Sequence, residues 1–87
     1  MAKAFEAKIP VQQLEDVNVA KVLVNKGEYK AAAAKLVDFC NANYTLRGEH
    51  GEIWSEFKLA ALLLVNATAD KVARIMRPIT NLYPRFK

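Results

Sequence analysis

The sequence predicts an all-α fold, a small bundle of four helices formed by one domain that spans residues 1–87. Apolar residues recur three or four positions apart over long stretches, which is the period of an amphipathic helix. Glycine and proline are rare and fall between these stretches, so they divide the chain into helical segments. Hydrophobic residues make up 53% of the chain, which is enough for a core.

The first two helices are expected at about 11–25 and 28–42. Residues 2–9 alternate between apolar and charged side chains and predict a short N-terminal arm. Pro10 suits the first turn of the helix that follows, because that turn does not need its missing N–H. Gly27 is a typical left-handed helix stop. In the second helix, Tyr29, Leu36 and Cys40 lie on the apolar side.

A third helix is expected at about 52–65, after a loop at 45–51. Trp54 and Phe57 lie on its apolar side and are predicted to face the core. The run Leu59–Val65 is apolar on every side of the helix. Such a helix is either fully buried at the centre of the bundle, or it uses one side to contact another copy of the chain.

The fourth helix is expected at about 69–77. Thr68 can cap it, and Asp70 in the first turn complements the helix dipole. Pro78 removes a backbone hydrogen bond, so the helix is expected to stop or kink near Arg77. The residues beyond it form a short aromatic and basic C-terminal tail.

Positive charge is concentrated at the C-terminal end of the chain. All five charged residues after position 70 are basic, whereas residues 1–70 carry a net charge of −1. The five are Lys71, Arg74, Arg77, Arg85 and Lys87. A basic end on a nearly neutral body favours an anionic partner, and the alternative is a charged tail that serves solubility.

The segment 61–77 resembles the helix-turn-helix unit of DNA-binding proteins. In that unit, apolar residues at set positions lock two short helices at a steep angle. The corresponding positions here are Ala61, Val65, Ala67, Val72 and Ile75, with Asn66 at the turn. The resemblance implies that Lys71 and Arg74 enter the major groove and that Arg77 and Arg85 contact phosphate. An ordinary helical hairpin is the alternative.

Catalytic and metal-binding patterns are lacking in the sequence. Cys40 and His50 are the only residues of their types, which is too few for a metal site, and no cofactor-binding motif occurs. Cys40 lies in the apolar register, which favours a buried thiol over a nucleophile. Arg47 and His50, in the glycine-containing loop, are candidate binding residues, although a plain connector is the alternative.

These observations predict a small non-enzymatic regulatory protein that binds nucleic acid or another anionic partner, such as an acidic protein surface, through its C-terminal helix. The alternative is a protein-interaction module, a small inhibitor or adaptor of the kind that viruses encode, which self-associates through Leu59–Val65. No cofactor and no membrane contact are expected. The absence of an export signal and the single cysteine favour the cytoplasm.

Overall fold

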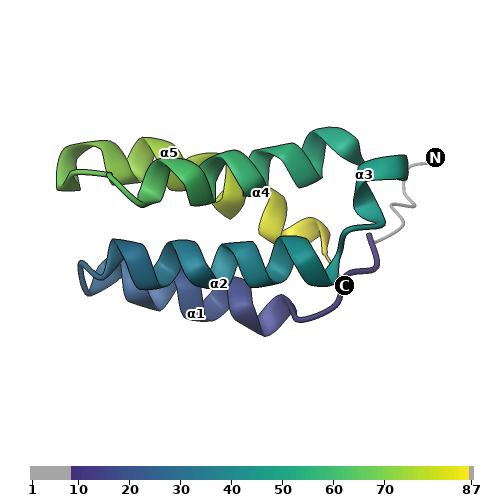
Figure 1. Ribbon diagram of the computed structural model, residues 1–87, viewed down its shortest axis with the longest axis horizontal. Coiled ribbons are helices and arrows are strands. Elements are labelled where there is room, and N and C mark those ends of the chain that lie inside the picture. Colours follow the sequence, from purple (N-terminus) through teal and green to yellow (C-terminus); the bar gives the residue numbers. More distant parts are fainter. Residues whose placement is uncertain (1–8, 87) are drawn as a thin grey trace.

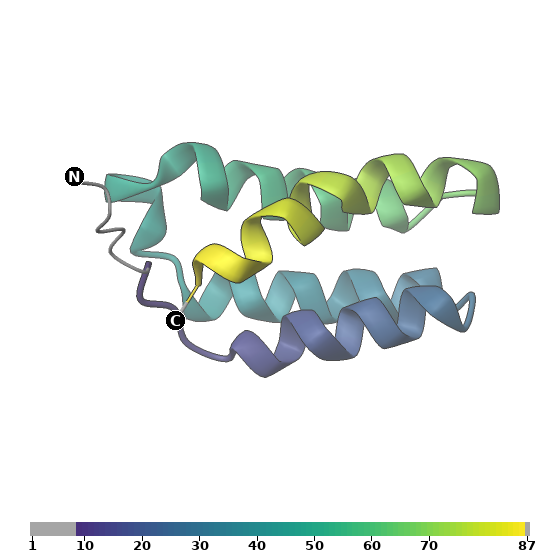
Figure 2. The same ribbon diagram turned by 180° about the vertical axis from the view of Figure 1, so that it is seen from behind.

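The computed structural model describes residues 9–86, and these form the helical bundle that the sequence predicts. The described elements, in order, are α1 (Leu14–Asn25), α2 (Tyr29–Ala42), α3 (Leu46–Glu49), α4 (Gly51–Leu64), α5 (Ala69–Leu82) and the 3-10 turn η2 (Tyr83–Arg85). Figure 1 shows two helical hairpins, α1–α2 and α4–α5, stacked along a common long axis. Seen from behind in Figure 2, the C-terminal part of α5 runs back toward the α1–α2 layer.

The first helix begins later than predicted, at Leu14, and Pro10 lies in the extended segment before it. Ile9 makes an isolated parallel bridge with Phe86, and its backbone N–H donates to the Arg85 carbonyl at 3.0 Å. This pairing holds the segment extended, and the left-handed backbone of Gln13 (φ 54°) then turns it into α1. The rest of the predicted N-terminal arm lies outside the described residues.

The side chain of Asn43 fixes the segment before α1 to the end of α2. The Gln12 backbone N–H donates to Asn43 Oδ1 at 2.6 Å, and Asn43 Nδ2 donates to the Gln12 carbonyl at 2.8 Å. The same nitrogen also lies 2.8 Å from the Phe39 carbonyl oxygen. Asn43 is the one buried polar side chain among residues 9–86, and these three bonds satisfy it.

The predicted loop at 45–51 contains the short helix α3, which the buried side chain of Leu46 anchors to the core. A single helical turn is too short to show apolar periodicity, which explains why the sequence pattern indicated a loop.

The apolar run at the end of α4 is not fully buried. Ala60, Ala61 and Leu64 pack inside, whereas Leu59, Leu62, Leu63 and Val65 are between 43% and 60% exposed. In a bundle of two stacked hairpins, α4 packs against α2 and α5, and its remaining side faces solvent (Figure 1). Full burial of the run is therefore wrong, and its other interpretation, a contact with another molecule, stays a prediction.

Helix α5 continues through Pro78 and ends at Leu82 rather than at Arg77. Proline costs the helix one backbone hydrogen bond. Beyond it, Ile79 is fully buried and Leu82 packs against the core, so burial of these side chains offsets the lost bond.

Three phenylalanines join α2, α4 and the C-terminal end of the chain. The ring centroid of Phe57 lies 4.8 Å from that of Phe39 and 5.5 Å from that of Phe86. Beside them Cys40 is fully buried, and burial raises the pKa of its thiol to about 11 despite an opposing effect of Lys58. Cys40 is therefore a protonated thiol at neutral pH, which is unsuited to nucleophilic attack.

Candidate nucleic-acid interface

Helix α5 presents three basic side chains to solvent. Val72, Met76 and Ile79 face the core, and the helical period then leaves Lys71, Arg74 and Arg77 exposed. Because these residues are three positions apart, they follow one side of the helix over about 9 Å. We call Lys71, Arg74 and Arg77 the α5 basic face.

The cations of the α5 basic face have no acidic partner among residues 9–86, where no ion pair forms. The nearest acidic residue in sequence is Asp70, in the first turn of α5. The Thr68 hydroxyl donates to Asp70 Oδ1 at 2.7 Å, and this bond lowers the pKa of the Asp70 carboxyl. Asp70 is thus ionised, and the four charged residues of α5 sum to +2.

Arg85 lies apart from the α5 basic face. It is exposed in η2, where it lines a shallow pocket together with Glu49, His50 and Glu52. A second depression again places Arg85 with Glu52, and with Glu56. Arg85 therefore lies in an acidic environment near the start of α4, unlike the other three predicted nucleic-acid-binding residues.

The α4–α5 hairpin lacks the steep crossing that the helix-turn-helix resemblance implies. Figures 1 and 2 show the two helices running in opposite directions, with the C-terminal part of α5 leaving α4 toward the α1–α2 layer. Val65, one of the positions expected to lock the helices together, is 43% exposed. The described hairpin is thus an ordinary antiparallel helix pair, and its interest for nucleic acid lies in its charge.

A second group of cations, at the junction of α2, α3 and α4, combines with aromatic rings. Arg47 Cζ lies 4.9 Å from the ring centroid of Tyr44 and 5.3 Å from that of Trp54. Lys58 Nζ lies 5.8 Å from the Trp54 centroid. The two rings meet edge to face, with centroids 5.8 Å apart and an interplanar angle of 87°. We call Tyr44, Arg47, Trp54 and Lys58 the cation–aromatic corner.

Sequence reasoning identified only Arg47 of this corner and assigned Trp54 to the core. Trp54 does pack against the core but is only partly buried, and its indole N–H donates to the Cys40 carbonyl at 2.9 Å. The spacing of Tyr44 from Arg47, and of Trp54 from Lys58, places each cation one helical turn from a ring. The sequence therefore contained the spacing of each cation–ring pair. The contact between the Tyr44–Arg47 pair and the Trp54–Lys58 pair depends on how α3 packs against α4.

His50, the other predicted loop residue, has a structural place between α3 and α4. His50 is partly buried. Its backbone N–H donates to the Leu46 carbonyl at 2.6 Å, and its backbone carbonyl accepts from the backbone N–H of Trp54 at 3.0 Å. His50 therefore joins the two helices by its backbone.

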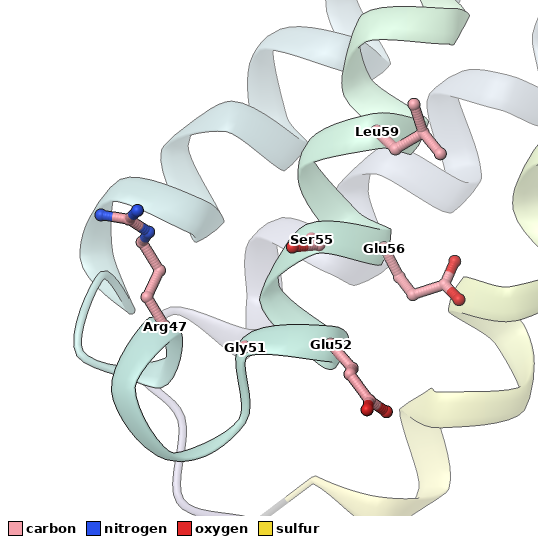
Figure 3. A pocket seen from close by; sticks show the side chains of 6 residues that line it. All are labelled: Arg47, Gly51, Glu52, Ser55, Glu56 and Leu59. Atoms are coloured by element: carbon pink, nitrogen blue, oxygen red, sulfur yellow. The ribbon is translucent and has the colours of Figure 1, made fainter.

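Arg47 is directed away from the acidic side chains at the start of α4. It lines a shallow depression with Glu52, Ser55 and Glu56, among others. Figure 3 shows its guanidinium pointing away from both carboxylates, which project toward the pale yellow C-terminal part of the chain. The charge of Arg47 is thus not neutralised by its acidic neighbours in that depression.

No family model matches this chain, and no curated protein or solved structure is similar enough to indicate a family. Within residues 9–86, no three His, Cys, Asp or Glu side chains are placed to hold a metal ion. None of the helices described for this chain is long and apolar enough to cross a bilayer.

Proposed function

We propose that this chain is a non-enzymatic binding protein whose α5 basic face contacts the phosphates of nucleic acid. The observation that carries the proposal is the exposure of Lys71, Arg74 and Arg77 on one side of α5, with no acidic partner in the described part of the chain. Three cations in register along a rigid helix can each neutralise a phosphate and release its condensed counterions.

The expected binding is sequence-tolerant. Phosphate contacts position a protein on nucleic acid, whereas base specificity needs side chains that reach the groove edges. An antiparallel hairpin does not present α5 as an isolated recognition helix, so backbone contact is the mode that its charge favours.

The test is the salt dependence of binding to duplex DNA and to single-stranded RNA, for wild type and for the triple variant K71Q/R74Q/R77Q. Each lost phosphate contact lowers the slope of log K against log salt by about 0.9 for duplex DNA. The triple variant is therefore expected to lose about 2.7 units of slope. Fluorescence anisotropy at several salt concentrations measures this directly.

A charge-matched control uses a lysine on the other hairpin. Lys35→Gln in α2 removes the same charge as Arg74→Gln, and is expected to leave the slope nearly unchanged. Equal effects of the two single variants, or a wild-type protein that fails to bind nucleic acid at low salt, would overturn the proposal.

A second candidate function, self-association, is favoured by the apolar side chains of α4. Leu59, Leu62 and Leu63 lie three and four positions apart and form an exposed stripe. In an antiparallel two-fold contact the stripe would meet itself, so the candidate partner is a second copy of this chain.

Sedimentation equilibrium tests the self-association. Leu62→Glu is expected to weaken it about tenfold or more, because a carboxylate would be buried in the contact. Val22→Glu, at a comparably exposed apolar position of α1, is the control and is expected to have no effect. A wild-type protein that stays monomeric at high concentration would contradict this candidate.

A further inference from the structure

We propose that the cation–aromatic corner binds a single nucleotide unit of a single-stranded nucleic acid, with the base stacked on the exposed ring of Tyr44 and the phosphate held by Arg47 and Lys58. The inference rests on the proposed function for its class of ligand. It uses a different surface from the α5 basic face, and it narrows the ligand from nucleic acid in general to unpaired strands.

Arg47 is held in place before any ligand arrives. Its guanidinium lies over both rings, 4.9 Å from the Tyr44 centroid and 5.3 Å from the Trp54 centroid, and it donates a hydrogen bond to the Tyr44 hydroxyl. A guanidinium has five N–H donors in a planar fork, so donors remain for a phosphate. Because the side chain is already ordered, binding costs less conformational entropy than for a free arginine.

The rings of the corner have a fixed geometry. The hydrogen bond from the indole N–H to the Cys40 carbonyl, at 2.9 Å, ties Trp54 to α2. Trp54 in turn holds Tyr44 edge to face, with centroids 5.8 Å apart. Tyr44 nevertheless remains 56% exposed, which is unusual for an ordered aromatic side chain. The exposed part of Tyr44, outside its contacts with Arg47 and Trp54, and the guanidinium plane are surfaces of the two kinds on which unpaired bases commonly stack.

Charge and ring surface together favour a nucleotide over a carboxylate. Arg47 and Lys58 give the corner two positive charges beside Trp54, and the guanidinium points away from Glu52 and Glu56 (Figure 3). An acidic peptide would use the cations but would leave the exposed ring without a partner. In a duplex the bases are already paired and stacked, so only a single strand can offer both a phosphate and a free base face.

Trp54 supplies a local probe because it is the single tryptophan of the chain. We expect a uniform single-stranded oligonucleotide to quench its fluorescence, excited near 295 nm to limit absorption by the bases. A duplex of the same length and poly-glutamate are expected to quench it at least tenfold more weakly at equal concentration. Equal quenching by either competitor would overturn the inference.

Variants of exposed residues separate stacking from charge. Tyr44→Leu removes a stacking surface and is expected to weaken quenching about tenfold, whereas Tyr44→Phe keeps the ring and is expected to bind nearly as wild type. Arg47→Gln is expected to weaken binding and to reduce its salt dependence. Circular dichroism of each variant checks that the bundle is intact, and wild-type quenching in both Tyr44→Leu and Arg47→Gln would overturn the inference.

The triple variant K71Q/R74Q/R77Q distinguishes this inference from the proposed function. At a saturating concentration of single strand it is expected to keep the full amplitude of Trp54 quenching, because the corner is unchanged. Loss of nucleic-acid binding in the triple variant, with normal quenching in the corner variants, would leave only the α5 proposal standing. Unchanged nucleic-acid binding in the triple variant, with weakened quenching in the corner variants, would leave only the proposal for the cation–aromatic corner standing.

Discussion

Phe57→Ala is expected to lower the free energy of unfolding by about 3–5 kcal/mol, the range for deleting a buried phenylalanine. Phe57 is fully buried on α4 and its ring contacts those of Phe39 and Phe86. The substitution therefore opens a cavity where three segments meet. A domain of 87 residues typically has a total stability of about 4–13 kcal/mol, so the variant is expected to lose a large fraction of its stability.

Chemical denaturation followed by circular dichroism measures this change. The matched control is Val22→Ala on α1, where the side chain is 51% exposed, lies outside the candidate self-association contact and leaves no cavity. It is expected to change stability by less than about 0.5 kcal/mol. Similar losses in the two variants would contradict the expectation, because an exposed valine would then matter as much as the buried ring of Phe57.

Helical periodicity predicted the fold class, because it depends on spacing within one segment. On α5, the helical spacing of Val72, Ile75, Met76 and Ile79 predicts an inward side, and in the structure these residues are buried or packed against the core. The exposure of Arg74 follows from the same phase. The predicted end of α5, near Arg77, was wrong. It rested on the effect of Pro78 on the helix backbone alone, without the burial of the residues that follow the proline. Packing between segments overrode the local preference there.

The candidate site was less predictable because its parts come from different segments. Arg85 was grouped with Lys71 by charge, but the turn η2 places it beside Glu52 instead. The cation–aromatic corner draws Tyr44 and Trp54 together from either side of α3. Spacing within one helix cannot reveal a contact between two segments. How much of each ring stays exposed also depends on how these segments pack together.

Asn43→Ala is expected to destabilise the protein by about 2–4 kcal/mol, because it removes three hydrogen bonds from a buried site, each with a net value near 1 kcal/mol. The lost bonds include both that fix the Gln12 backbone. We therefore expect a local effect as well, in which the segment before α1 opens and the bridge between Ile9 and Phe86 weakens.

Amide hydrogen exchange distinguishes this local opening from global loss of stability. In the variant, the Gln12 and Ile9 amides are expected to exchange faster by a larger factor than amides in the middle of α2, since their own hydrogen bonds are lost or weakened. Asn41→Ala, at an exposed position of α2, is the control and is expected to leave both stability and exchange nearly unchanged. Uniform acceleration across the bundle would instead mean that Asn43 supports the whole core. The reason would be that the segment before α1 and the C-terminal end of the chain, where Phe86 contacts Phe39, together cover the core.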